Sequence, residues 1–267
     1  MTDDFAPAAI ARWHAGRLQP VEYCDMSEVA LAVADSWLVT EGTSLALDLH
    51  RHRFSRTARD FLAESEIAAF WDAAVAGIPH TGNWFPRVEL QLRTGVPLLV
   101  ARARPAPQLH RSIVLATNQG ADPRTTPSVK GPDLDALIRL RTSAQARGAK
   151  ESVILSPDGF VVDGATTAIL WWRGDALCVP SPELARVDSV TAKVVVGLAI
   201  ARGIDVLYES VTPAELDGIE VWAVNALHGI RIVTGWVDGP ALAEQPGRLS
   251  LWRAQLAALA RPLPPQA

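Results

Sequence analysis

The stretch Val153-Ile-Leu-Ser-Pro-Asp-Gly-Phe-Val-Val-Asp-Gly-Ala-Thr-Thr-Ala168 decides the class of fold. Its apolar runs at 152–156 and 160–162 flank the turn formers Pro157-Asp-Gly159, which is the pattern of a β-hairpin. A second pair of apolar runs, 168–172 and 176–179, flanks the turn 173–175. Hairpins place neighbouring strands antiparallel, so a long, purely parallel sheet is not expected.

Helical spacing surrounds these hairpins. Asp133 can cap a helix whose leucines recur at helical intervals and which ends at Gly148. Further helices are expected at 189–202, 213–216 and 248–260, and strands at 204–208 and 221–224. In the first half we expect strands at 87–92, 98–101 and 112–115, and a strand over 45–53 running into a helix of residues 50–62. Mixed strands and helices in both halves predict an α+β (mixed α/β) architecture.

Residues 120–130 are rich in turn formers and lack apolar periodicity. They divide the chain into halves of similar size, each long enough for a domain. We therefore expect an N-terminal α/β domain over 1–119, an interdomain loop over 120–130, and a C-terminal α/β domain over 131–267.

Composition narrows the classes of partner. The net charge is −4 and the basic residues are scattered, so no nucleic-acid-binding surface is indicated. The acidic start of the chain is unlike a signal peptide, and no apolar run reaches the roughly 20 residues of a membrane span. We expect a cytoplasmic protein that binds a small molecule and not a membrane. No histidine or cysteine spacing suggests a metal site, and Cys24 and Cys178 are expected to be free thiols.

Lysine is rare in this chain. Of 25 basic residues only three are lysines, namely Lys130, Lys150 and Lys193. Low lysine use is by itself a feature of the composition and does not indicate a function. It nevertheless limits the residues able to form a Schiff base to three, because arginine cannot lose its proton and attack a carbonyl.

Several separated segments resemble the class IV aminotransferases, which are fold type IV enzymes dependent on pyridoxal 5'-phosphate (PLP). The stretch 153–168 resembles that family's hairpin, with its acidic residue followed by Gly and small hydroxyl residues. Ser189-Val-Thr-Ala-Lys193 resembles its Gly-(Val/Ile)-Thr-Arg helix start, and Val224-Asn-Ala-Leu-His-Gly-Ile-Arg-Ile-Val233 its last strand and turn. His50-Arg-His-Arg-Phe54 resembles its first helix. The resemblance implies the two-domain fold of the D-amino acid aminotransferase type.

The resemblance also implies roles for individual residues. Lys130 matches the lysine that forms the Schiff base to PLP and then moves the Cα proton, and its neighbours Val129 and Gly131 favour desolvation of the amine. Asp163 stands where the family has a glutamate facing the pyridine nitrogen. The remaining implied cofactor residues are Arg53, Val190, Thr191, Asn225 and Ala226. Hydroxyl groups near the substrate are expected from Ser36, Thr166 and Thr167.

The chain departs from the family's pattern at several positions. Ala34-Asp-Ser36 replaces Phe-Glu-Thr, Ala168 replaces an Asn, and Ala226 stands where several members carry a phosphate-binding Thr. Asp163 is one methylene shorter than glutamate. These changes bear on the identity of the substrate and on the affinity for the cofactor.

Three functions are compatible with this pattern. One is a lyase resembling 4-amino-4-deoxychorismate lyase, which releases pyruvate; the length and the Asn225-Ala-Leu227 turn slightly favour it. The second is a true transaminase of the branched-chain or D-amino acid type. The third is a non-catalytic binding protein that keeps the fold. The resemblance further implies a homodimer, with Trp71, Trp84 and Phe85 as interface or pocket-lining residues.

Overall fold

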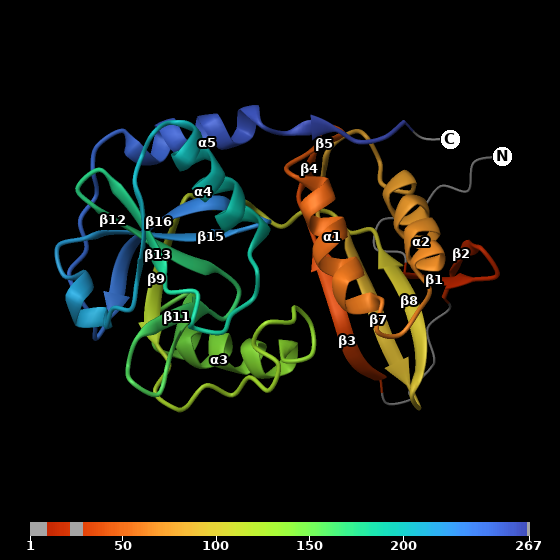
Figure 1. Cartoon of the computed structure of the whole chain (residues 1–267), viewed down its shortest axis with the longest axis horizontal. Coiled ribbons are helices and arrows are strands. Elements are labelled where there is room, and N and C mark those ends of the chain that lie inside the picture. Colours follow the sequence, from red (N-terminus) through yellow and green to blue (C-terminus); the bar gives the residue numbers. More distant parts are fainter. Residues whose placement is uncertain (1–9, 22–28, 266–267) are drawn as a thin grey trace. The chain divides into compact units, whose positions relative to one another are not determined.

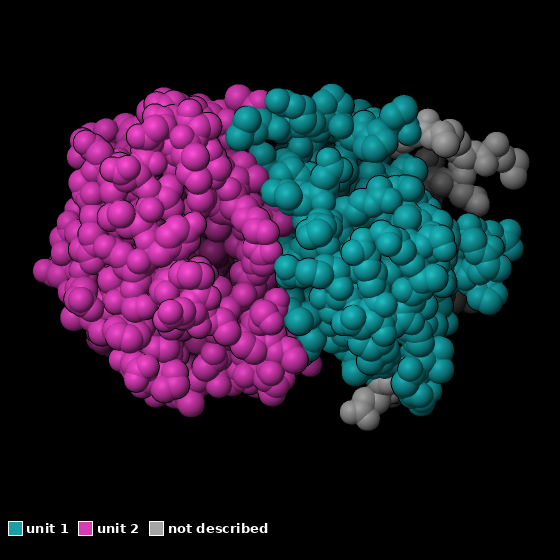
Figure 2. Space-filling model, in the orientation of Figure 1, with its two compact units in different colours: residues 1–108, 129–132, 259–267 teal, residues 109–128, 133–258 magenta. Residues whose placement is uncertain are grey.

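The computed structural model describes residues 10–21 and 29–265. The chain forms two compact units, coloured separately in Figure 2. Unit 1 holds the chain up to residue 108, the short segment 129–132 and the C-terminal residues from 259. Unit 2 holds residues 109–128 and 133–258. Cys24 lies outside the described residues.

This division differs from the expected boundary at residues 120–130. Residues 112–117 form β9, which pairs in parallel with strands of unit 2, so the stretch from 109 belongs there. At the other end, β17 (Arg261–Pro262) pairs with β5 (Thr43–Ser44) in unit 1. Strand pairing between residues distant in sequence decides both boundaries, and local turn composition does not reveal it.

Unit 1 is built on a five-stranded sheet in the order β2-β1-β8-β7-β3, seen in Figure 1 with two helices packed against it. The strands are β1 (Ile10–His14), β2 (Arg17–Pro20), β3 (Val29–Ser36), β7 (Arg87–Arg93) and β8 (Val96–Arg102). The helices are α1 (Leu47–Ala58) and α2 (Glu64–Ala76). A smaller sheet joins β17, β5, β4 (Val39–Thr40) and β6 (Asn83–Trp84).

The strand expected to start at residue 45 is wrong, because α1 begins at Leu47 directly after Ala46. Alternating leucines at 45, 47 and 49 suggest a strand. The side chains that α1 buries are spaced by three and four instead, as in His50, Arg53 and Phe54. Ala46 has a left-handed backbone (φ 49°), which sets the sharp entry into the helix.

Aromatic side chains fill the core of unit 1. Trp71 is 2% exposed and its ring lies 4.8 Å from that of Trp37. Its predicted role at an interface or pocket is therefore wrong, because its side chain is part of the buried hydrophobic core of unit 1. The indole of Trp84 donates to the carbonyl of Thr81, and Phe85 lies beneath the Arg104 guanidinium. An interface role for these two residues stays a prediction.

Unit 2 is built on an eight-stranded mixed sheet in the order β11-β10-β9-β16-β15-β12-β13-β14. Its strands are β9 (Ser112–Thr117), β10 (Glu151–Leu155), β11 (Val161–Gly164), β12 (Ala168–Arg173), β13 (Ala176–Pro180), β14 (Val206–Glu209), β15 (Glu220–Asn225) and β16 (Gly229–Val237). Its helices are α3 (Leu134–Ala146), α4 (Val190–Ala201), the 3-10 turn η1 (Pro213–Leu216) and α5 (Arg248–Ala258).

Both predicted hairpins are present. β10 pairs antiparallel with β11, and β12 pairs antiparallel with β13, while β9 runs parallel to its two neighbours. The α+β prediction is thereby confirmed. Within the described part of the chain, no helix combines the length and apolar character needed to cross a membrane.

Candidate active site

Lys130 lies in the segment 129–132 of unit 1 and is half-buried. Its carbonyl oxygen accepts a hydrogen bond from the Ala34 amide at 2.7 Å, so its backbone is fixed to β3. Val129, on one side of it, packs against the hydrophobic core of unit 1. The lysine backbone is thus held in place while the surrounding stretch has no regular secondary structure.

Arg53 is buried in unit 1 and forms a two-pronged ion pair with Asp35. Its Nε donates to Asp35 Oδ2 at 2.8 Å and its Nη2 to Oδ1 at 2.7 Å. His50 Nδ1 lies 2.8 Å from the same Oδ1. Burial opposes ionisation of Asp35, but the neighbouring Arg53 and His50 outweigh it and hold the pKa of this carboxyl well below its usual range.

This cluster gives Arg53 a structural partner that the sequence pattern did not reveal. The spacing of His50 and Arg53 places both on one face of α1, which was the available signal. Two guanidinium nitrogens are engaged with Asp35, so binding of a phosphate by Arg53 stays a prediction. Ser36 is buried at the end of β3, and its amide donates to Asp35 Oδ1 at 2.7 Å.

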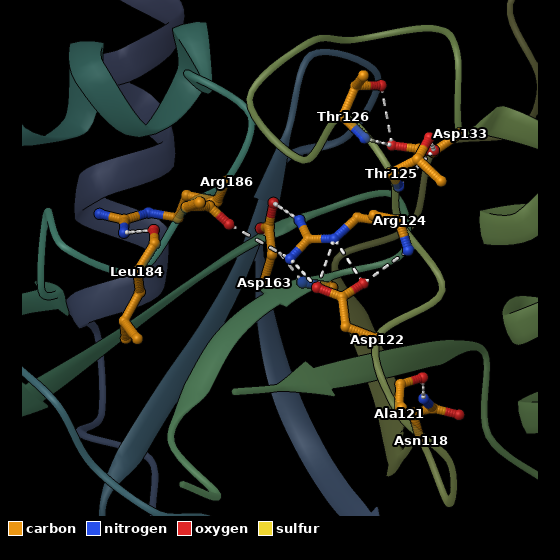
Figure 3. Close-up of polar contacts among 12 residues, drawn as sticks. Asn118, Ala121, Asp122, Arg124, Thr125, Thr126, Asp133, Asp163, Leu184 and Arg186 are labelled. Atoms are coloured by element: carbon orange, nitrogen blue, oxygen red, sulfur yellow. Dashed lines mark hydrogen bonds and ion pairs between the residues drawn. The ribbon is translucent and has the colours of Figure 1, made fainter. Parts of the chain in front are cut away.

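Asp163 is the central residue of unit 2's candidate site. It lies on β11 and is 6% exposed. Among the described residues, the only hydrogen bond to its carboxylate comes from the Gly164 amide at 3.2 Å. Arg124 Nη1 is 4.0 Å from Oδ2 (Figure 3). Burial raises the pKa of Asp163 to about 7, an effect that Arg124 and Arg186 only partly offset.

The two arginines beside Asp163 are themselves held by other groups. The guanidinium of Arg124, with a side chain 3% exposed, binds both oxygens of Asp122, at 2.9 Å and 2.8 Å. Arg186 donates to the carbonyls of Pro180, Ser181 and Leu184. Both lie in loops without apolar periodicity, so sequence reasoning gave no reason to select them. In Figure 3 the guanidinium of Arg124 faces Asp163, whereas that of Arg186 points towards the Leu184 carbonyl.

Thr166 and Thr167 belong to a tight turn that follows Asp163. The Gly164 amide donates to the Thr167 carbonyl at 2.7 Å. A Cβ at Gly164 would lie 2.4 Å from Thr167 Oγ1, so the turn requires glycine. The hydroxyl of Thr166 donates to the buried carboxylate of Glu151 at 2.5 Å. Thr167 Oγ1 is buried and has no hydrogen-bond partner among the described residues.

Glu151 was not selected from the sequence. It is 0% exposed at the start of β10, and it accepts hydrogen bonds from Thr166 and from the Ser152 amide. Burial raises its pKa, against the effect of these bonds. An acidic residue at the start of an apolar strand is a weak signal, which becomes informative only once the fold shows its side chain to be fully buried.

Val190 and Thr191 are buried in the first turn of α4. Ser189 caps this helix, because its side chain accepts a hydrogen bond from the Ala192 amide at 3.2 Å. The first amides of a helix have no partner within it, and the helix dipole favours an anion there. The same turn carries Lys193, which is exposed and paired with Asp188 at 2.6 Å.

Asn225 ends β15 and connects two turns. Its Nδ2 donates to the Thr166 carbonyl at 3.2 Å, and its Oδ1 accepts from the His228 amide at 2.9 Å. Ala226, next to it, is half-buried. Unit 2 therefore brings together Asp163, Thr166, Thr167 and Asn225 at the ends of β11 and β15, whereas Lys130, Arg53 and Ser36 belong to unit 1.

Metal ligands do not gather in the part of the chain that the structure describes, since no three His, Cys, Asp or Glu side chains are placed to hold an ion. Cys178 is buried and unpaired. Burial raises the pKa of its thiol to about 11, which keeps it protonated.

Solved structures of aminotransferases share this fold. A branched-chain aminotransferase from Thermoproteus uzoniensis, solved with norvaline, has a TM-score of 0.82 at 19% identity, covering 95% of this chain and 99% of that chain. The branched-chain enzyme from Escherichia coli gives 0.79 at 14%, with 94% of each chain covered. An aminotransferase from Brucella abortus bound to PLP gives 0.77 at 17%, covering 94% and 98%.

These likenesses establish the type IV fold. None of the curated proteins compared with the chain matches it. The sequence profile of amino-transferase class IV matches residues 32–236, which is most of the chain and extends from within β3 past the β15–β16 turn. The chain therefore belongs to the class IV aminotransferase family, whose cofactor is PLP.

Proposed function

We propose that the chain is a PLP-dependent enzyme that breaks the Cα–H bond of an amino acid, with Lys130 as the catalytic amine. Its favoured reaction is a pyruvate-releasing lyase reaction of the 4-amino-4-deoxychorismate lyase type. The observation that carries the proposal is the state of Asp163, a buried carboxylate with a single hydrogen bond among the described residues.

A buried carboxylate is stable only if charge or hydrogen-bond donors compensate it. Asp163 has Arg124 at 4.0 Å and a pKa raised to about 7, so the protein alone compensates it incompletely. A protonated pyridine nitrogen is a cationic donor of the kind this carboxylate lacks. The residues therefore fit PLP at the position that the family's glutamate occupies.

The start of α4 suits the phosphate end of the cofactor. The amides of Val190 and Thr191 lie in its first turn, and Ser189 already caps the Ala192 amide. An anion at this end would be stabilised by the free amides and by the helix dipole. Arg53 supplies a further guanidinium in unit 1. To bind the phosphate, it would have to divide its hydrogen bonds between Asp35 and the phosphate.

Lys130 Nζ would hold PLP at its aldehyde group and would accept the Cα proton of the substrate. When bound, PLP draws electrons from Cα and so weakens the bond to that proton. A neutral amine is needed for both tasks, and partial desolvation favours it. Half-burial beside Val129 is consistent with this requirement.

Release of pyruvate instead of amino transfer requires a proton donor near the departing group. Thr166 already donates to Glu151, whereas Thr167 Oγ1 has no partner in the described structure. Thr167 is thus the stronger candidate among the predicted hydroxyls of unit 2. The Asn225-Ala-Leu227 turn, tied to the same loop through the Thr166 carbonyl, adds the sequence likeness to the lyases.

The assay that separates the two enzyme functions measures two products on the PLP-loaded protein. Lyase activity yields pyruvate and 4-aminobenzoate from 4-amino-4-deoxychorismate, while transaminase activity yields a new amino acid only when a 2-oxo acid is added. Both should vanish in Lys130→Ala. Amino transfer without pyruvate would replace the lyase by a transaminase. If the protein binds PLP but forms neither product, the remaining function is that of a non-catalytic binding protein.

We further propose a homodimer, because the resemblance to the family implies one. Light scattering after size-exclusion chromatography should give about twice the 28.7 kDa chain mass. A monomeric mass that persists at high protein concentration would contradict the dimer without affecting the chemistry proposed for Lys130.

A further inference from the structure

The segment that carries Lys130 is unusual in its connectivity. Residues 129–132 belong to unit 1, whereas the chain immediately before and after them belongs to unit 2. A four-residue segment contains too little side-chain area to hold itself in place by burial alone. Specific contacts with unit 1 must therefore fix it.

One such contact joins backbone to backbone. β3 is the edge strand of the five-stranded sheet, with β7 on its inner side. The Ala34 amide of β3 donates to the Lys130 carbonyl at 2.7 Å. This bond satisfies an edge amide that the sheet leaves unpaired, and it ties the lysine's own peptide to a rigid element.

Gly131 makes this close approach sterically feasible. A Cβ at this position would lie 2.9 Å from the Ala34 nitrogen, 3.0 Å from Val33 Cα and 3.1 Å from Val33 C. All three are backbone atoms of β3, so no side-chain rotation relieves the contact. Gly131 also has φ of +141°, a conformation that residues with a Cβ rarely adopt.

We propose that Gly131 is a positioning residue for Lys130, since only a residue without a side chain lets the lysine's peptide dock on the edge of β3. This inference rests on the proposed role of Lys130. Any side chain at 131 must push the 130–131 backbone away from β3, and it displaces the lysine's Cα with it. Displacements near 1 Å at a reacting group cost on the order of 100-fold in rate.

The test compares Gly131→Ala with Gly120→Ala. Gly120 lies in the same turn-rich stretch, but a Cβ there has nothing within 4 Å, and its φ is outside the left-handed range. Each variant is mixed with PLP and reduced with borohydride, and the PLP attached to Lys130 is quantified by peptide mass mapping over time. Gly131→Ala should slow attachment about 100-fold, whereas Gly120→Ala should match wild type.

A second measurement separates positioning from general damage. The dissociation constant of PLP is measured in Lys130→Ala and in Lys130→Ala/Gly131→Ala, where no covalent bond to residue 130 can form. The proposal predicts equal constants in these two proteins. A further loss of affinity in the double variant would show that Gly131 shapes the cofactor site as a whole, and it would overturn the proposal.

Should Gly131→Ala not fold, Val129→Ala takes its place, because it loosens the other side of Lys130 without adding an atom near β3. Slower attachment in a folded Val129→Ala protein supports positioning by the anchored segment, and an unchanged rate overturns it. If wild type itself attaches no PLP at Lys130, the proposed function fails. If wild type attaches PLP and Gly131→Ala does so equally fast, only the present inference fails.

Discussion

Replacing Asp163 by Asn should change how the stability of the cofactor-free protein depends on pH. The pKa of this carboxyl is raised from 3.8 to about 7 by burial in the folded protein. A carboxyl with a raised folded pKa binds its proton more tightly in the folded state than in the unfolded state. Its contribution to stability is therefore complete below pH 3.8 and is lost progressively as the pH rises towards 7.

The size of the effect follows from the two pKa values. Each pKa unit corresponds to about 1.4 kcal/mol, so a rise of roughly three units costs about 4 kcal/mol of unfolding free energy above pH 7. Burial is nearly complete at 6% exposure, so solvent screening is small. The neighbouring Glu151, whose pKa burial also raises, adds to the rise in the pKa of Asp163.

Urea unfolding of the apo protein at several values between pH 4 and 8 provides the measurement. Between pH 4 and pH 8, the unfolding free energy of Asp163→Asn should fall by about 4 kcal/mol less than that of wild type. Asp35 and Glu89, whose pKa values are lowered, contribute the opposite slope, but they do so equally in both proteins.

Asp158→Asn is the matched control, since Asp158 is exposed in the turn between β10 and β11. It should follow the wild-type profile. Parallel curves for wild type and Asp163→Asn would contradict a raised pKa of Asp163. Asp163 would then not be the uncompensated buried carboxyl on which the fit of PLP to unit 2 rests.

Three further predictions concern local structure and use urea unfolding at pH 7. Asp35→Asn leaves Arg53 buried without its carboxylate and should cost about 3–5 kcal/mol; no loss would show that water replaces the pair. Gly164→Ala brings a Cβ to 2.4 Å from Thr167 Oγ1 and should cost about 1–3 kcal/mol, with partial recovery in Gly164→Ala/Thr167→Ala. Ser189→Ala removes the cap of α4 and should cost about 1 kcal/mol; unchanged stability would mean that another group caps the helix.

Local sequence patterns predicted the two hairpins of unit 2, but not that β9 belongs to this unit beside β16. Its hairpins combine apolar runs with strong turn formers, and both the β10–β11 and the β12–β13 pairs form where these patterns predicted them. The helix expected from Ser189 to Arg202 is present as α4, from Val190 to Ala201. Here short-range signals and tertiary structure agree.

Unit 1 was harder to predict because its structure depends on distant pairing. β3 gains its place from a seven-residue antiparallel register with β7, more than 50 residues later in the chain, and the C-terminal β17 joins β5. The leucines at 45, 47 and 49 imitate a strand although α1 includes two of them. No local pattern shows which of these alternatives the core selects.

The candidate site shows the same limit. A family likeness selected Lys130 and Asp163 as candidates, but it gave no information on the groups that surround them. Arg124 and Glu151 affect Asp163 through burial and charge, and these appear only once the loops are folded. The backbone anchor at Gly131 likewise depends on β3, a strand that the sequence pattern had not predicted.

The most direct test of the central claim is an absorption spectrum of the purified protein with PLP, compared among single substitutions of its three lysines. Lys150→Ala and Lys193→Ala serve as controls, because both side chains are exposed. We predict an absorption band near the visible edge in wild type and in both controls, shifted by an amino acid substrate and absent in Lys130→Ala. An unchanged band in Lys130→Ala would contradict the assignment of Lys130 as the residue that binds the cofactor.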